Sequence, residues 1–224
     1  SVLSEIGLND ISPIQAKKLI EDSVLPSIDV GLKGLMEGVR IAKKFKVPVV
    51  LHNAAASKKV ILECAKEYPI ISGHSNHSSY TVEGAVQFAE KLKQLGAIID
   101  VSTLDTFGAR RLVDSPEWLF ALLKKEGLVD TISTDYAGGH HDPILLALQK
   151  AVESNVIDLV SAIPLATYNV AKAIPLLAPN RGLIAPGKIA DLVLVKSKNI
   201  SEVDMVLVGG KVVVTKGKIN KNIA

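Results

Sequence analysis

Two histidines and one aspartate follow three short apolar runs that are typical of buried strands. His52 lies at the end of VPVVLHN, His74 follows PIISG, and Asp135 follows DTIST. In parallel α/β proteins the chemically active side chains gather where the strands end. Imidazole nitrogens and carboxylate oxygens are ligands of divalent metals such as zinc. The spacing therefore predicts that His52, His74 and Asp135 form most of a hydrolytic metal site.

Each of these residues also has a plainer structural interpretation. A histidine at a strand end can simply be a hydrogen-bonded part of the fold, and aspartate is a common turn residue. Three further histidines lie just beyond two of the same strand ends, namely His77, His140 and His141. They are candidates for substrate contacts, with solvated loop histidines as the alternative.

The bulk composition limits the classes of protein to consider. The chain has 224 residues, 48% hydrophobic and 4% aromatic, which is enough for one large aliphatic core. Its 26 cationic and 23 anionic residues give a net charge of +3 and form no basic block, so nucleic acid is not an expected partner. No apolar run approaches the ~18 residues of a membrane span, so a membrane is not expected either. Cys64 is the only cysteine, which excludes an intramolecular disulfide and favours a cytoplasmic location.

Strand-like and helix-like segments alternate over residues 1–174, which predicts an α/β fold. The expected strands are apolar on both faces, as parallel strands under helices are, and lie near residues 2, 47, 69, 97 and 130. The last clear helix is expected over residues 164–174. Beyond residue 179, β-rich runs separated by glycine turns predict antiparallel strands. We therefore expect a first portion over residues 1–178 and a small β module over residues 179–224.

The end of the chain resembles a known family. The stretches RGLIAPGKIADLVLV (181–195) and MVLVGGKVVV (205–214) closely resemble the carboxyl-terminal part of the metal-dependent amidohydrolase superfamily. The stretch ATYNVAKAIPL (166–176) resembles the helix that precedes that part. On the looser evidence of SEIGL (4–8), the enamidase-like and cyclic-amidase-like branches look nearest.

The resemblance implies a partial TIM-type (β/α) barrel, comprising about strands four to eight, followed by a small β-sandwich tail. It assigns metal-ligand positions to His52 on the fifth strand, His74 on the sixth and Asp135 on the eighth. Glu5 falls where the family has a bridging lysine or glutamate on the fourth strand. The implied cofactor is a divalent metal, zinc by default with iron or manganese as alternatives, present as one or two ions.

The activity implied by the resemblance is hydrolysis of an amide or cyclic amide in a small-molecule substrate. Asp135 is expected to take a proton from the attacking water and pass it to the leaving nitrogen. His77 and His140 are expected to contact the substrate or stabilise charge that develops on it.

One family feature is missing, because no His-x-His pair occurs in the sequence. We therefore expect a fragment that is inactive alone and that folds with a missing N-terminal half or as a homo-oligomer. The alternatives are a deaminase on the same scaffold and a non-catalytic relative. A doubly wound nucleotide binder is disfavoured, because no glycine fingerprint follows any strand.

Overall fold

A parallel sheet forms the centre of the structure. The computed structural model describes residues 5, 7, 10–23, 27–104, 115–136 and 142–220. Four strands hydrogen-bond in the order β1-β2-β3-β4, with β1 at one edge. Their bounds are β1 Val50–His52, β2 Ile71–Gly73, β3 Ile98–Ser102 and β4 Thr131–Ser133. This order, in which each strand pairs with the next one along the chain, is that of a section of a (β/α) barrel.

The register of these strands aligns their carboxyl ends. His52 pairs with Gly73 at the end of β1 and β2, and Ser102 pairs with Ser133 at the end of β3 and β4. Because all pairings are parallel, the residues that follow each strand emerge at the same edge of the sheet.

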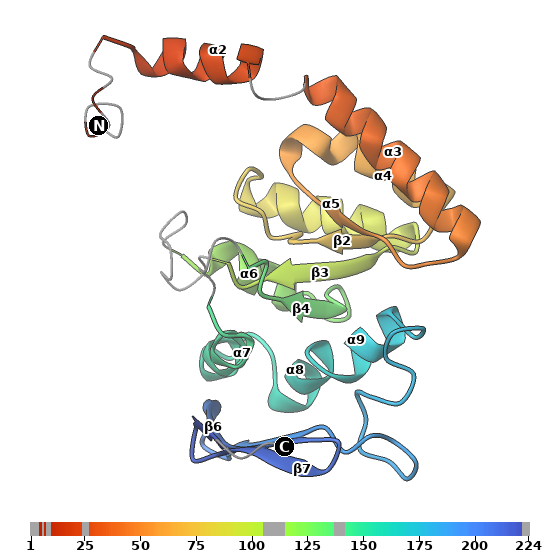
Figure 1. The fold of residues 1–224 in the computed structure, drawn as a ribbon, viewed down its shortest axis with the longest axis vertical. Coiled ribbons are helices and arrows are strands. Elements are labelled where there is room, and N and C mark those ends of the chain that lie inside the picture. The colour runs from red at the N-terminus through yellow and green to blue at the C-terminus, as the bar shows by residue number, and fades with distance from the viewer. Residues whose placement is uncertain are drawn as a thin grey trace.

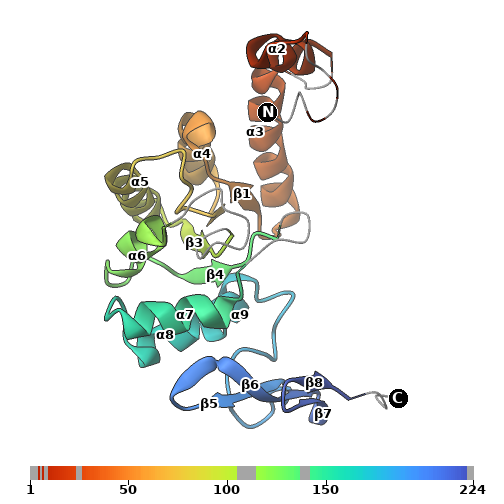
Figure 2. The ribbon, with the colours of Figure 1, turned by 90° about the vertical axis from the view of Figure 1, so that its left-hand side faces the viewer.

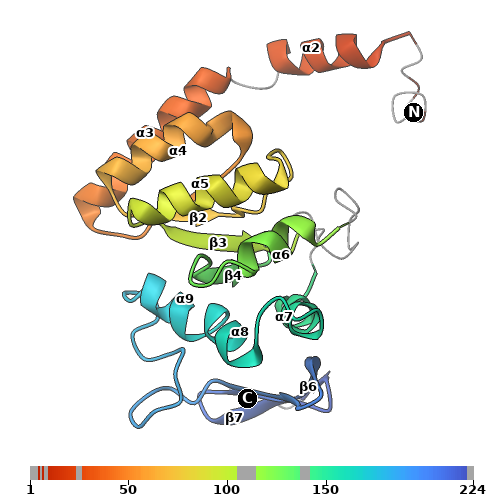
Figure 3. The same cartoon turned by 180° about the vertical axis from the view of Figure 1, so that it is seen from behind.

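Helices cover the parallel sheet on one side (Figures 1 and 3). They are α4 Lys58–Glu67, α5 Val82–Gln94 and α6 Glu117–Leu123, with a short 3-10 turn at Ala55–Ser57, while α3 Ile28–Phe45 packs against α4. Helix α5 illustrates this packing. Its buried residues Ala85, Phe88, Ala89 and Leu92 follow the spacing i, i+3, i+4, i+7 and therefore lie on one face. The Trp118 indole N–H of α6 donates to the Tyr80 carbonyl at 2.9 Å, which anchors α6 beside the segment before α5.

A second group of helices separates the parallel sheet from an antiparallel sheet. Figures 1 and 2 show the first two of these helices between β4 and the antiparallel sheet. The elements are α7 Ile144–Glu153, α8 Leu159–Leu165, α9 Tyr168–Ala173, β5 Leu192–Lys196, β6 Asn199–Val208, β7 Lys211–Thr215 and β8 Lys218–Ile219. The backbone N–H of the buried Ile200 donates to the Gln149 side chain at 2.8 Å and joins β6 to α7. None of the described helices is long and apolar enough to cross a membrane.

Most expected elements are confirmed, but two expected elements differ from the structure. The bounds of the helix expected over residues 164–174 are wrong, because two helices, α8 from Leu159 and α9 to Ala173, occupy this region with Ala166 and Thr167 between them. Asp158 caps the N-terminus of α8 by accepting the Ser161 backbone N–H at 2.9 Å. The strand expected at the start of the chain is not found at Glu5, which is helical and exposed.

The tail forms a single antiparallel sheet in the order β5-β6-β7-β8. The second layer that a β-sandwich requires is not present among residues 179–220. Likewise, the four described parallel strands form an open section and not a closed barrel. The division at residue 179 falls between α9 and β5 and stays a prediction.

The core generates a stability prediction. Phe88 is 2% exposed and its ring stacks on Tyr80 with centroids 5.8 Å apart, whereas Phe45 is 66% exposed. We expect Phe88→Ala to lower the free energy of unfolding by about 3–5 kcal/mol, through lost burial and the cavity left behind. The matched control, Phe45→Ala, should change it by less than about 0.5 kcal/mol. Urea unfolding followed by circular dichroism measures both, and equal losses would contradict this core.

Candidate metal centre

Three of the predicted site residues converge at the carboxyl edge of the parallel sheet. His52 ends β1, His74 directly follows β2, and Asp135 follows β4. Each offers one ligand atom, and these atoms lie within 4.8 Å of one another. The group combines two imidazole nitrogens with a carboxylate oxygen, a donor set suited to zinc, iron or manganese.

The two imidazoles face each other directly. His52 Nδ1 and His74 Nε2 are 2.6 Å apart, so one nitrogen carries a hydrogen and the other accepts it. His74 is buried, His52 is exposed, and Asp135 is half-buried. The remaining ring nitrogen of His74, Nδ1, is buried and has no hydrogen-bond partner among the described residues. Such an unpaired buried nitrogen lowers the free energy of unfolding by roughly 1–3 kcal/mol. The donor set fits a cation, which would also separate the two facing rings.

The backbone is unusual at two of the three residues. His74 has φ of 38° and Asp135 has φ of 47°, both in the left-handed region that residues with a side chain rarely adopt. A conformation of this kind costs on the order of 1–3 kcal/mol and persists only where the surroundings hold it. The chain therefore turns sharply at the end of β2 and shortly after β4, and both turns need support from neighbouring groups.

Asp100 supplies part of that support, and our reading of the sequence missed it. Its buried carboxylate on β3 accepts hydroxyl hydrogens from Thr131 and Ser133, each at 2.7 Å. The His74 backbone N–H lowers the pKa of this carboxylate, and the Asp100 carbonyl accepts the Ser75 N–H at 2.8 Å. The signal that could have revealed Asp100 is a charged residue in the middle of the apolar run AIIDVS.

A second buried network supports the ends of β1 and β2. The Tyr80 hydroxyl donates to Asn53 Oδ1 at 2.7 Å, and the Asn53 amide donates to Ser72 Oγ at 3.0 Å. Ser72 Oγ in turn lies 2.9 Å from Ser75 Oγ. Asn53 follows His52 and Ser75 follows His74, so this network fixes the backbone beside both histidines.

Burial controls the protonation of the polar groups at this edge. Burial lowers the pKa of His74, opposed by Asp135 and reinforced by His52 and His77. Burial also lowers the pKa of His77. His74 and His77 are therefore neutral at pH 7, which leaves a nitrogen lone pair on each ring. Burial raises the pKa of Asp100, while the hydrogen bonds from Ser133 and Thr131 lower it.

The other expected site residues fall in three groups. His77 lies beside the centre, with its ring centroid 5.1 Å from that of His74. His140 and His141 lie outside the described residues. Glu5 is exposed, helical and not part of the described His–His–Asp group, and its role as a ligand stays a prediction. The nearest described helix in sequence, α2 (Pro13–Ser23), has no buried residue.

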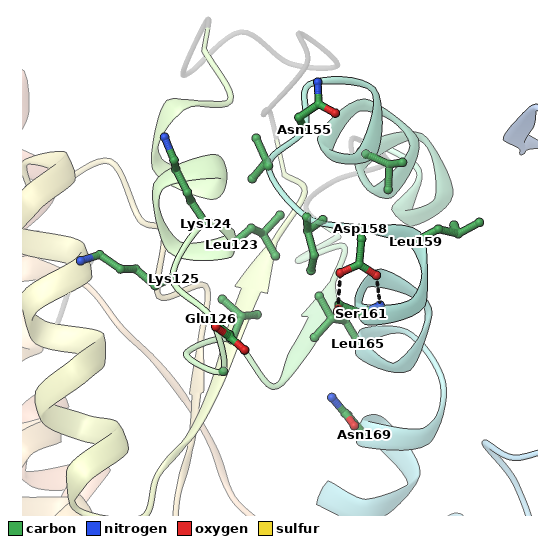
Figure 4. Close-up of a pocket in the computed structure, with 15 residues that line it drawn as sticks. Leu123, Lys124, Lys125, Glu126, Asn155, Asp158, Leu159, Ser161, Leu165 and Asn169 are labelled. Atoms are coloured by element: carbon green, nitrogen blue, oxygen red, sulfur yellow. Dashed lines mark hydrogen bonds between the residues drawn. The ribbon is translucent and has the colours of Figure 1, made fainter.

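A hollow of about 820 Å³ lies at the opposite end of β4, before the strand begins (Figure 4). Its polar groups have local structural roles: the Asp158 carboxylate accepts the Ser161 N–H and hydroxyl at 2.9 and 2.8 Å. Leu123 and Leu165 form part of its apolar lining. The hollow shares no residue with the His–His–Asp group, so we assign the chemistry to the carboxyl edge.

An α/β fold whose strands end in a His–His–Asp group is typical of metal-dependent hydrolases. Comparison with known families makes this specific, because the sequence matches the amidohydrolase family over residues 14–213. This match covers most of the chain, and the protein belongs to the amidohydrolase family, within the metal-dependent amidohydrolase superfamily. The expected enamidase-like branch stays a prediction.

Individual relatives share sequence or fold with part of their length. Adenine deaminase 1 of Carboxydothermus hydrogenoformans is 30% identical over 142 residues, covering 63% of this chain and 20% of that protein. A β-aspartyl dipeptidase from Fervidobacterium islandicum AW-1, solved with a β-Asp-Leu dipeptide, has a TM-score of 0.62 at 19% identity, covering 90% of this chain and 57% of its own. A 5-methylcytosine deaminase from Klebsiella pneumoniae has a TM-score of 0.58 at 18% identity, covering 88% and 54%. The two structures show a shared fold, and this chain spans little more than half of each.

The network beside the histidines generates a second prediction. Asn53→Ala leaves the Tyr80 hydroxyl and Ser72 Oγ without their shared partner, which should lower the free energy of unfolding by about 1–3 kcal/mol. Adding Tyr80→Phe removes one of the stranded groups, so the double variant should lose less than the sum of the single variants. Urea unfolding of the four proteins measures this coupling. Strict additivity would show that the network does not act as a unit.

Proposed function

We propose that this chain carries part of the active site of a metal-dependent hydrolase that cleaves C–N bonds in small amides or cyclic amides. The observation that carries the proposal is the convergence of His52, His74 and Asp135 at the ends of three parallel strands. Membership of the amidohydrolase family supports the same chemistry.

We propose zinc as the default ion, with iron or manganese as alternatives. His52 and His74 would hold it through ring nitrogens and Asp135 through a carboxylate oxygen. The described ligand group contains three residues and excludes Glu5, which favours one ion over two at this part of the site. When bound, a divalent metal lowers the pKa of a coordinated water and polarises a substrate carbonyl.

The chain's own residues would handle the protons. Asp135 is half-buried within the His–His–Asp group, so its carboxylate can reach both solvent and a bound substrate. As general base it would accept a proton from the attacking water, and as general acid it would return that proton to the leaving nitrogen. Since the left-handed turn fixes its backbone, the carboxylate would be positioned before the substrate binds.

His77 is the described residue best placed to contact the substrate. Its Nδ1 accepts the Ser79 backbone N–H at 3.0 Å, so the neutral ring carries its hydrogen on Nε2. That N–H can donate to a substrate oxygen as negative charge develops on it. His140 is proposed for a similar role on the evidence of sequence alone.

A second candidate function is deamination of an amino-substituted ring. The specific observation in its favour is the 30% identity to an adenine deaminase. Deamination also replaces a C–N bond by attack of water, so the same three residues would serve. The fold does not separate the two functions, because the structural relatives include a dipeptidase and a deaminase.

We further propose that the site is completed by additional polypeptide, either a further segment of the protein or a second copy. Strand β1 lies at the edge of the sheet, and its Val50 side chain is 57% exposed. An open parallel edge of this kind invites pairing with another strand. Taken alone, the chain is proposed to be inactive, and the proposed setting is the cytoplasm with a small-molecule substrate.

Metal binding gives the first test. After removal of metals by a chelator and incubation with Zn²⁺, the protein should retain about one tight equivalent, because three preformed ligands converge. His52→Ala and His74→Ala should lose it, whereas His77→Ala, a matched removal of a neighbouring imidazole, should keep it. Elemental analysis after gel filtration measures the content. Less than about 0.1 equivalent in the unaltered protein would contradict an intact site.

Turnover gives the second test, in protein produced from its complete coding sequence. Asp135→Asn keeps the size of the side chain and removes its basicity, so kcat should fall by about 10²–10⁴-fold. Ammonia release from aminopurines and amine release from N-acyl and cyclic amides are assayed in parallel, and the substrate class that is turned over decides between the two candidates. An undiminished kcat in Asp135→Asn would remove this carboxylate from the mechanism.

A further inference from the structure

Asp100 occupies a position that no ligand role explains. It lies within β3, the strand between β2 and β4, and its side chain is buried with the residue 6% exposed. His74 follows one neighbouring strand, and Asp135 follows the other. The carboxylate of Asp100 thus lies between the strands that carry the buried histidine and the acidic residue of the metal centre.

Its contacts join those two strands. Thr131 and Ser133, both on β4, each donate a hydroxyl hydrogen to one of its oxygens at 2.7 Å. From the other side, the backbone N–H of His74 lowers the pKa of the same carboxylate, and the Asp100 carbonyl accepts the Ser75 backbone N–H at 2.8 Å. Two hydroxyl donors thus converge on one buried carboxylate, and hydrogen bonds to a charged acceptor are stronger than those between neutral groups.

These contacts act where the backbone is held in a costly conformation. The N–H that the Asp100 carbonyl accepts belongs to Ser75, which directly follows His74, and Ser133 lies two residues before Asp135. Both His74 and Asp135 have positive φ. The Asn76 side chain pairs with the Ser102 backbone at 2.8 and 2.9 Å and holds the turn after β2 to β3. Among these described contacts, those of Asp100 join the turn after β2, through its carbonyl, to β4, through its carboxylate.

We propose that Asp100 is a positioning residue that sets the separation of His74 from Asp135 and thereby the affinity of the centre for its metal. The inference rests on the proposed function, since it assumes that His74 and Asp135 hold the ion. Outer residues that orient ligands typically contribute 10- to 100-fold to metal affinity or activity.

The chain contains a matched comparison in Asp130. It also ties β3 to β4 through a side-chain carboxylate, which accepts the Ile99 backbone N–H at 2.8 Å and the Lys93 ammonium at 2.5 Å. Asp130 precedes β4, so its contacts lie at the end of the sheet remote from the metal centre. Asp130→Asn therefore weakens the same pair of strands without touching His74 or Asp135.

The test measures Zn²⁺ affinity by competition with a chromophoric chelator and the visible absorption of the Co²⁺-loaded protein. Thermal unfolding of the metal-free proteins is recorded alongside. We expect Asp100→Asn to weaken Zn²⁺ binding by about 10- to 100-fold and to alter the Co²⁺ bands, which report ligand geometry. Asp130→Asn should leave both unchanged, even where it lowers the unfolding temperature as much. Ser133→Ala, which retains the carboxylate but removes one donor, should weaken binding in the same direction.

The possible results distinguish the positioning role of Asp100 from the proposed metal centre. If Asp100→Asn has the same Zn²⁺ affinity and the same Co²⁺ absorption bands as Asp130→Asn, the positioning role is overturned while the metal centre stands. If Asp100→Asn does not fold, Ser133→Ala decides, and an unchanged affinity there overturns the role. If His74→Ala binds Zn²⁺ as tightly as the unaltered protein, the proposed metal centre itself fails.

Discussion

The parallel register of β1 to β4 is the constraint on which the site depends. Only when His52 stands opposite Gly73, and Ser102 opposite Ser133, do the residues after β2 and β4 emerge beside the end of β1. A shift of one residue in any pairing would turn the affected side chains to the other face of the sheet. Three of the four strands have only three residues, so helices packed on the sheet must hold this register.

The site sets two opposing effects against each other. Left-handed backbone at His74 and Asp135 and an unpaired buried imidazole nitrogen both raise the free energy of the folded protein. Buried hydrogen bonds from Asp100 and from the Asn53–Tyr80 network offset part of that cost. The outcome is a His–His–Asp group whose backbone is held in place, which is the preorganisation that the proposed metal centre would need.

The sequence predicted what depends on local pattern. Apolar runs predicted the four described parallel strands. The positions of His52, His74 and Asp135 at or after the ends of three of these strands predicted that they lie close together. What the sequence could not reveal depends on tertiary contact. Asp100 resembles a misplaced charge in the sequence, and only the structure shows that the Thr131 and Ser133 hydroxyls donate to it and that the Ser75 N–H donates to its carbonyl. Glu5 differs from the other three predicted ligands, because its family-derived position lies outside the described His–His–Asp group and its role stays a prediction.

The most direct measurement is anomalous diffraction at the zinc absorption edge from crystals of the protein loaded with one equivalent of Zn²⁺. The account predicts an anomalous peak bounded by His52, His74 and Asp135, with the two histidine rings moved apart to admit it. A well-ordered site without such a peak, or a zinc ion bound elsewhere in the chain, would contradict it.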